Sequence, residues 1–354
     1  MTTTARPKEL ARIRPPTPPP NPWQSFPARL LTPWPTAALK PVAVKTGSRD
    51  YVSCVCWSCD GKRMASCGYE RSVRVWNPER TTDLHLTTTL SGGHDSPVHH
   101  VTWHPSDPFT LASLSKSDKA LSIWDVRQPT KPLFTLHTPL ELLTLEWHPS
   151  GTSLLALSTD DGLYEKPGAS VPVPESLPGS SWVLGTRHAG HGQLNAFLFS
   201  HTGTHLLLSK VSGTLEILSL PAFNSRIKLS AHVGSCYTAA LDPRGWYCAT
   251  GGADAVLNLW DTREWIVKRV FDAECVLMPV REVAFSHDGE YLACALDDIP
   301  GVDIYETETG LRTLRIPTPG PAATIAWHPS KWILAVGGDG GASARQGWCC
   351  FFGL

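Results

Sequence analysis

The sequence has 354 residues, enough to bury a large core, and its 31 Lys and Arg nearly balance 32 Asp and Glu, giving a net charge of −1. It contains no apolar run long enough to span a bilayer and no secretory signal pattern, which argues against membrane-spanning and secreted proteins. Most of the ten cysteines lie within apolar segments, so we expect a reducing, intracellular compartment.

The first 39 residues are unlike the rest of the chain. They include the stretch RPPTPPPNPW, in which prolines remove backbone donors and favour extended, polyproline-like structure. Residues 1–50 carry eight Lys or Arg against two Asp or Glu, so a basic segment precedes a mildly acidic body. We expect residues 1–39 to form a disordered arm; docking on a partner through its aromatic side chains is the alternative. The arm also offers Arg12, Arg14 and Trp23 for weak, strongly salt-dependent RNA contacts.

One pattern repeats from residue 40 to residue 354. Residues 229–264 show it most fully: an Ala-His pair, an apolar strand, a Pro-Arg-Gly turn, a strand of small residues, a Gly-Gly-Ala-Asp turn and a strand closed by Trp-Asp. Alternation at period two between turn residues predicts antiparallel strands rather than helices. The last residue of each first strand recurs at intervals of 42 to 52 residues, at Trp57, Trp103, Trp147, Phe199, Leu241, Phe285 and Trp327.

Repeats of about 40 to 45 residues with His near the start and Trp-Asp at the end are typical of WD40 proteins, in which each repeat supplies one propeller blade. Seven strand ends at this period predict an all-β fold, a seven-bladed WD40 β-propeller forming one domain over residues 40–354. Residues 40–46 would supply the outer strand of the last blade and so close the ring.

Polar residues at matching positions accompany two repeats. In the first set we expect His232, Thr250 and Trp260 to join Asp254 in a chain of hydrogen bonds that locks strand to turn. A catalytic or metal-binding His–Asp pair is the alternative, but the same spacing recurs without a further ligand. The second set consists of His94, Ser113 or Ser115, Asp118 and Trp124.

Other repeats depart from this pattern. The first has Ser48 and Glu70 at the His and Asp positions, so its network is incomplete. In the third, the Pro/Gly/Ser-rich residues 165–181 are expected to form a surface loop that replaces part of the outer edge of the blade.

The sequence contains no pattern typical of catalysis. It lacks a nucleophile elbow, a phosphate-cradling glycine loop and paired carboxylates outside the turns. We interpret the recurrent turn histidines as solvent-facing, since one position in repeat after repeat is not an active site; they are His104, His148 and His328. We therefore expect a non-enzymatic platform for partner proteins, with no cofactor, metal or small-molecule substrate.

Longer stretches point to a particular family. They are VCWSCDGKRMAS, TWHPSDP, TGGADAVLNLWD, PVREVAFSHDGEYLA and TIAWHPSKWILAV. Through them, residues 45–354 resemble the THO complex subunit 3 family. This resemblance implies a nuclear scaffold in the complex that couples mRNA transcription and processing to export. Its implied partners are the other THO core subunits and, through the complex, a DEAD-box RNA helicase and an RNA-export adaptor, with RNA contacted mostly indirectly and no membrane involved.

An alternative function rests on two short matches. Residues 124–127 and 260–263 fit the WDxR box of substrate receptors for cullin-4 ubiquitin ligases. In that case Arg127 and Arg263 would anchor the ligase adaptor through charge-assisted hydrogen bonds. The simpler interpretation is that Arg is common at this exposed position.

Overall fold

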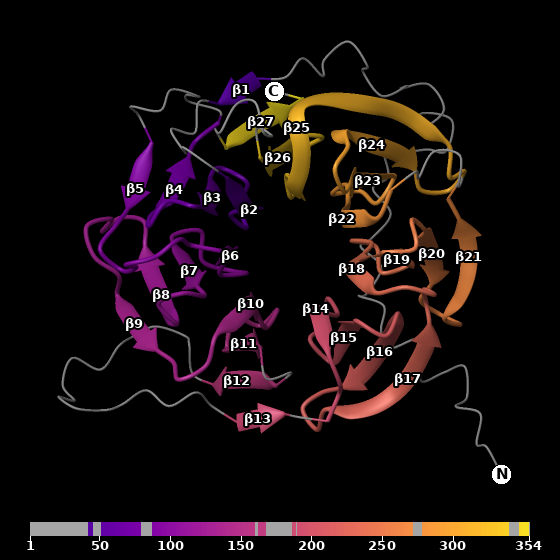
Figure 1. Ribbon diagram of the computed structural model, residues 1–354, viewed down its shortest axis with the longest axis horizontal. Coiled ribbons are helices and arrows are strands. Elements are labelled where there is room, and N and C mark those ends of the chain that lie inside the picture. The colour runs from indigo at the N-terminus through magenta and orange to yellow at the C-terminus, as the bar shows by residue number, and fades with distance from the viewer. Residues whose placement is uncertain are drawn as a thin grey trace, which may run out of the picture.

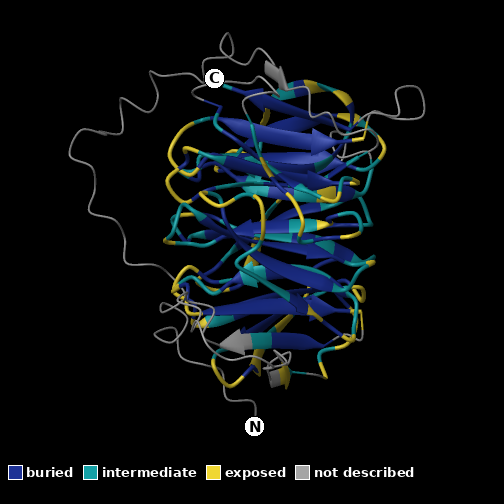
Figure 2. Ribbon diagram, turned by 90° about the vertical axis from the view of Figure 1, so that its left-hand side faces the viewer, coloured by how far each residue is buried: buried dark blue, intermediate teal, exposed yellow. Residues whose placement is uncertain are grey.

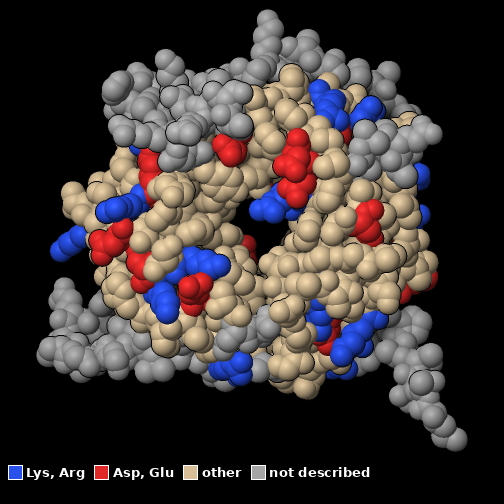
Figure 3. All heavy atoms as spheres, in the orientation of Figure 1, with Lys and Arg blue, Asp and Glu red and all other residues tan. Residues whose placement is uncertain are grey.

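The computed structural model shows strands placed around a central axis (Figure 1). It describes residues 42–44, 51–78, 87–159, 162–167, 186–188, 190–271, 278–339 and 347–353. All regular secondary structure in these ranges is β. Within them, no helix is long and apolar enough to cross a membrane. The space-filling view shows an opening at the centre of the disc (Figure 3).

Five antiparallel sheets have four strands each, in chain order. The first contains β2 (Val52–Trp57), β3 (Met64–Gly68), β4 (Val73–Trp76) and β5 (Thr88–Leu90), and the second contains β6 (His100–Trp103), β7 (Thr110–Ser115), β8 (Ala120–Asp125) and β9 (Phe134–His137). The third contains β10 (Leu142–Trp147), β11 (Ser153–Ser158), β12 (Leu163–Pro167) and β13 (Thr186–His188), and the fourth contains β14 (Leu194–Phe199), β15 (His205–Lys210), β16 (Thr214–Ser219) and β17 (Asn224–Ser230). The fifth contains β18 (Cys236–Leu241), β19 (Tyr247–Gly252), β20 (Leu257–Asp261) and β21 (Ile266–Val270). We call them repeats 1 to 5.

The sixth sheet has seven strands. It contains β22 (Val280–Phe285), β23 (Tyr291–Leu296), β24 (Pro300–Glu306), β25 (Arg312–Trp327), β26 (Leu334–Gly338), β27 (Trp348–Phe352) and β1 (Val42–Val44). The expectation of seven blades is therefore wrong for the hydrogen-bonded sheets, since the described residues form six. The reason is β25, which pairs with β24 through its first half and with β26 through its second half. We call β22–β24 with the first half of β25 repeat 6, and the rest of this sheet repeat 7.

The seven strand ends predicted from the sequence pattern are confirmed. Strands β2, β6, β10, β14, β18, β22 and β25 end at Trp57, Trp103, Trp147, Phe199, Leu241, Phe285 and Trp327. Second strands are almost wholly buried, as every residue of β7 and β19 is, because other sheets cover both of their faces. Edge-on, buried residues fill the strands while the loops are more exposed (Figure 2).

Apolar side chains form a separate cluster between each pair of adjacent repeats. Seven such clusters are found in the described residues, one at each junction around the ring. The cluster between repeats 7 and 1 includes Met64, Trp76 and Phe351, all fully buried. Because no single core runs through the molecule, its cohesion depends on every repeat having a neighbour on both sides.

The ring is closed by the earliest described segment. Strand β1 pairs antiparallel with β27, with Val42 opposite Phe351 and Val44 opposite Cys349. This pairing covers the edge that β27 would otherwise expose (Figure 1).

Repeat 3 is more regular than expected. Residues 165–167 belong to β12, which pairs with β11 from Leu163 to Pro167, and β13 supplies an outer strand. The expectation that a loop starting at residue 165 replaces the outer edge is therefore wrong for these residues; 168–181 lie outside the described residues. The sequence did not reveal this strand because its composition is largely polar. Tyr164 and Glu165 pair through backbone hydrogen bonds, which form whatever the side chain is.

Candidate functional site

The turn between the first and second strands joins each of three repeats to the next. In each, an imidazole Nε2 lies at hydrogen-bond distance from a glycine carbonyl oxygen: His104–Gly151 at 3.2 Å, His148–Gly203 at 3.0 Å and His328–Gly61 at 2.9 Å. Since Nδ1 of His328 accepts from the backbone N–H of Ser330 at 3.1 Å, its Nε2 carries the proton and donates. His328 is only 3% exposed, so the interpretation as solvent-facing is wrong for this residue, whereas His104 and His148 are half-buried.

These contacts explain the glycines of the turns. Gly61, Gly151 and Gly203 have φ angles of +69°, +73° and +68°. A Cβ atom on Gly151 would lie 2.5 Å from the His104 ring, far inside van der Waals contact. Both the backbone conformation and the neighbouring ring therefore require glycine here.

The structure brings together the four polar residues of repeat 5. Trp260 Nε1 donates to Thr250 Oγ1 at 3.0 Å, and Thr250 Oγ1 lies 3.0 Å from His232 Nε2. His232 Nδ1 lies 3.0 Å from Asp254 Oδ1. Because the Asp254 carboxylate can only accept, Nδ1 carries the proton directed at it, and Nε2 of the neutral ring then accepts from the Thr250 hydroxyl. Asp254 also accepts from the backbone N–H of Val233 at 2.9 Å, so the chain links the third strand to the loop that enters the repeat.

The corresponding residues of repeat 2 meet in the same way. Ser113 Oγ lies 2.7 Å from both Trp124 Nε1 and His94 Nε2. His94 Nδ1 is 3.5 Å from Asp118, a longer separation than in repeat 5. Burial lowers the pKa of His94, and Asp118 opposes this effect. Of the two hydroxyls considered from the sequence, Ser113 makes the contact.

Repeats 4 and 6 have charged clusters instead, which the sequence reasoning missed. Glu216 of β16 is 1% exposed and forms ion pairs with Lys210 at 2.5 Å and Lys228 at 3.4 Å. Burial alone would raise the pKa of Glu216, but contacts with Lys210 and Ser225 outweigh it and lower the pKa to about 2. The signal was a single acid flanked by apolar residues in a third strand, as in TLEILS.

Asp303 of β24 lies at the matching position in repeat 6. It is 1% exposed and lies 3.4 Å from Arg315 and 3.7 Å from Arg312. In repeat 1, Arg74 forms a two-bonded pair with Glu70 at 2.9 and 3.0 Å. Glu70, at the Asp position of the incomplete network, is thus paired with an arginine; Ser48, at the His position, lies outside the described residues.

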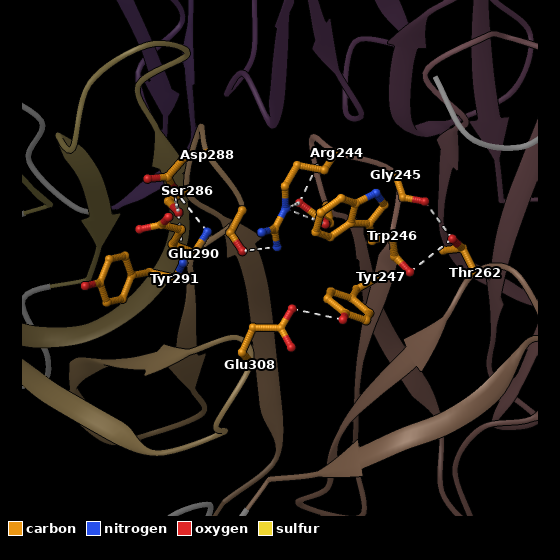
Figure 4. Close-up of polar contacts among 12 residues, drawn as sticks. Arg244, Gly245, Trp246, Tyr247, Thr262, Ser286, Asp288, Glu290, Tyr291 and Glu308 are labelled. Atoms are coloured by element: carbon orange, nitrogen blue, oxygen red, sulfur yellow. Dashed lines mark hydrogen bonds and ion pairs between the residues drawn. The ribbon is translucent and has the colours of Figure 1, made fainter. Parts of the chain in front are cut away.

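The junction between repeats 5 and 6 is our candidate interaction surface. Here Asp242 and Arg244 replace the turn histidine: the Arg244 guanidinium binds Asp242 at 3.1 Å and donates to the carbonyl of Gly289 at 2.6 Å (Figure 4). The same guanidinium stacks 4.7 Å over the Trp246 ring. Burial raises the pKa of Asp242, and the nearby Arg244 opposes this.

The outer side of this junction is tied by a second set of contacts. Glu308 of repeat 6 accepts a hydrogen bond from the Tyr247 hydroxyl at 2.9 Å (Figure 4). It also accepts one from Lys268 at 3.0 Å. Lys268 also contacts the Tyr247 hydroxyl, and Arg269 donates to the backbone carbonyl of Glu308 at 3.0 Å. Four side chains of repeat 5 thus hold repeat 6, which fixes the geometry of the surface they share.

The two arginines of the WDxR matches differ in their surroundings. Arg127 forms a two-bonded pair with Asp125 of its own repeat, at 2.9 and 2.7 Å, although its side chain is 62% exposed. Arg263 is exposed, and its backbone N–H donates to Asp261 at 2.7 Å. The arm residues Arg12, Arg14 and Trp23 lie outside the described residues.

Cavities and metal-binding groups give little further indication of function. A cavity of about 300 Å³ lies between repeats 3 and 4, with a mainly apolar lining that includes Leu155, Phe199 and Phe223. Among the residues that the structure describes, no group of three or more His, Cys, Asp or Glu side chains could hold a metal ion.

Comparison with known proteins defines the class. Residues 39–77 and 85–125 match the family model described as WD domain, G-beta repeat. The β-propeller domain of Cps50 (Swd1) from Myceliophteria thermophila superimposes with a TM-score of 0.71 at 18% identity, covering 86% of this chain and 96% of that one. The protein is a WD40-repeat β-propeller.

Two relatives cover much of the sequence. THO complex subunit 3 of Arabidopsis thaliana is 30% identical over 298 residues, which are 83% of this chain and 88% of the relative. WD repeat-containing protein AAC3 of Dictyostelium discoideum is 28% identical over 265 residues, 68% of this chain but only 52% of that protein. The chain belongs to the THO complex subunit 3 family.

Proposed function

We propose that this protein is a non-catalytic scaffold subunit of a THO/TREX complex in the nucleus, where it couples mRNA transcription and processing to mRNA export. The observation that carries the proposal is the extent of the similarity to THO complex subunit 3, which covers 83% of this chain and so most of the ring. Short WD repeat matches occur in proteins of many functions, whereas similarity over a whole ring includes the loops and edges that select partners.

The proposed partners are the other THO core subunits. A DEAD-box RNA helicase and an RNA-export adaptor would associate through the complex, with RNA contacted mostly indirectly. The rigid junction of repeats 5 and 6 supports a role in protein contacts, because a surface whose side chains are already fixed loses little conformational entropy on binding. This junction also contains two of the sequence stretches on which the family resemblance rests.

Affinity purification tests the proposal. Tagged protein from nuclear extract should recover the THO core subunits and the helicase, and RNase treatment should leave recovery of the core unchanged because its contacts are between proteins. Loss of the core after RNase, or recovery of a cullin-4 adaptor without any THO subunit, would refute the proposal.

A double substitution distinguishes the proposed function from the ligase alternative. Replacing Arg127 and Arg263 with Ala should leave recovery of THO subunits unchanged, whereas a WDxR receptor would lose its adaptor. Since Arg127 also neutralises Asp125, the melting temperature of the variant must be compared with that of wild type to exclude a folding defect.

We also propose that the ring works as seven blades, with β25 shared by the last two. Seven apolar clusters, one at each junction, support this count although the hydrogen-bonded sheets number six in the described residues. An experimental density map should show seven equal sectors around the channel; six would contradict the proposal.

A further inference from the structure

Exposed apolar side chains are concentrated on one rim strand and the turn next to it. Ile266, Val267 and Val270 of β21 are 55%, 43% and 56% exposed, and Leu311 in the neighbouring turn of repeat 6 is 66% exposed. Four of the seven exposed large hydrophobic residues in the described part of the chain are therefore here. Clusters of this kind on a soluble protein mark interaction surfaces more often than isolated exposed residues do.

Strand β21 and the turn next to it form one continuous surface. Arg269 packs against Gly310, where a Cβ atom would lie 2.3 Å from its Cδ, and donates to the carbonyl of Glu308. Leu311 follows directly in the chain. We call β21 and Leu311 the rim patch.

The strand is fixed at both ends although its own residues are exposed. Trp265 before it is 4% exposed and Phe271 after it is 2% exposed, and each packs into an apolar cluster between repeats. The rim patch is therefore a preformed strand rather than a frayed end.

The outer edge of this strand has unused hydrogen-bonding groups. Strand β21 is the last of its sheet and lies at the periphery of the disc (Figure 1), with no strand paired to its outer side among the described residues. The backbone N–H of Phe271 donates inward to Leu257 at 2.9 Å. Because backbone groups alternate in direction along a strand, the N–H and C=O of Val270 point outward.

The charged residues on the outer strands of this side of the disc are basic. Strands β17, β21 and β25 carry six basic residues and no Asp or Glu: Arg226, Lys228, Lys268, Arg269, Arg312 and Arg315. Two of the acids that pair with them, Glu216 and Asp303, are 1% exposed, whereas the Lys228 side chain is 64% exposed. The third, Glu308, has a side chain that is 51% exposed and pairs with Lys268. The six basic side chains therefore outnumber the three acids that pair with them, and only one of these acids is exposed.

We propose that the rim patch binds an acidic, extended segment of a partner protein, which adds a strand to the free edge of β21. Main-chain hydrogen bonds would give affinity, aliphatic contacts with Ile266 and Leu311 would give register, and the surrounding Lys and Arg would select acidic residues. The inference extends the proposed scaffold function by naming the chemistry of one partner.

Other occupants fit less well. A second copy of β21 would place Lys and Arg opposite like charges, which is unfavourable in paired strands. The N-terminal arm of this chain is itself basic. Single-stranded nucleic acid binds through stacking on aromatic rings, whereas the exposed apolar side chains here are aliphatic.

Two substitutions test the patch in tagged full-length protein. Ile266→Asp with Leu311→Asp should reduce recovery of the partner about tenfold or more, since it removes central apolar contacts and repels acids. Val270→Pro should do the same by removing an outward N–H, while Val270→Thr keeps that group and should bind. The matched control is Tyr69→Asp with Val211→Asp, which changes two exposed apolar residues elsewhere.

A photo-crosslinking amino acid at position 266 identifies what binds. The expected product is a crosslink to a partner segment with an excess of Asp and Glu. A THO subunit as its source supports both proposals, whereas an acidic segment of an unrelated protein supports the rim patch and contradicts the proposed function. Crosslinks to RNA, to a second copy or to a non-acidic segment would overturn the inference. So would undiminished recovery with both the Asp double variant and Val270→Pro.

Discussion

Single hydroxyl groups hold the complete polar networks together. Thr250 lies between the indole of Trp260 and the ring of His232, so it is both acceptor and donor in a buried site. Asp254 is the end of the chain rather than a common acceptor for both rings, which leaves Trp260 paired with Thr250 even when Asp254 is changed.

We expect Thr250→Val to destabilise the protein by about 1–3 kcal/mol, because it leaves the buried indole N–H and the imidazole Nε2 without a partner. The free energy of unfolding measured with urea checks this. Thr152→Val, at an exposed turn, is the control and should have little effect. Equal losses for the two variants would show that the network does not contribute to stability.

The contact of His104 with Gly151 makes a second prediction. Gly151 and Gly192 share a φ angle of +73°, but nothing lies within 4 Å of a Cβ atom on Gly192. Both Ala variants bear the strain of this backbone conformation, and only Gly151→Ala adds a clash with an aromatic ring. We expect it to be about 1–3 kcal/mol less stable than Gly192→Ala. Adding His104→Ala should recover part of the difference in chemical denaturation.

At the scale of the strand, burial shifts the pKa of ionisable groups on the strands nearest the centre of the ring. Glu146 on β10 is half-buried, and burial raises its pKa from 4.5 to about 7 despite a hydrogen bond from Thr102. The folded protein therefore binds a proton that the unfolded chain releases between about pH 4.5 and 7. The stability contributed by this proton is fully present below pH 4.5 and is lost as the pH rises through 7.

Glu146→Gln stays uncharged at every pH, so its melting temperature relative to wild type should rise between pH 5 and pH 8. His100 on β6, whose pKa burial lowers to about 4, works in the opposite direction but is present in both proteins and cancels in the comparison. A difference that stays constant with pH would show that Glu146 ionises as freely in the folded protein as in the unfolded chain.

Strand ends were predictable from the sequence, but contacts between repeats were not. The seven strand ends follow from turn residues and alternation, which are local signals. Residues 312–327 form one continuous strand that pairs with both β24 and β26. No local pattern in RTLRIPTPGPAATIAW predicts this continuity. In the same way, nothing near His104 in sequence reveals that its partner is the carbonyl of Gly151. The rim patch was missed because IVKRV looks like an ordinary outer strand until its exposure is known.

For the whole molecule, closure of the ring is the decisive contact. Removing residues 1–39 should leave the melting temperature unchanged, whereas removing residues 1–47 also deletes β1 and exposes the edge of β27. We expect the longer deletion to melt several degrees lower and to aggregate more readily. Identical melting curves for the two truncations would show that the ring holds without this strand.

The pairing of β1 with β27 also constrains the biosynthesis of the protein. The two strands are roughly 300 residues apart in the chain. A ribosome adds about 5–20 residues per second, so β1 is made roughly 15–60 s before its partner exists. During that interval Met64 and Trp76, which the finished ring buries against repeat 7, have no neighbour to cover them. The nascent chain therefore exposes an aggregation-prone apolar surface until the last repeat is synthesised. Chaperones are needed most before the ring closes.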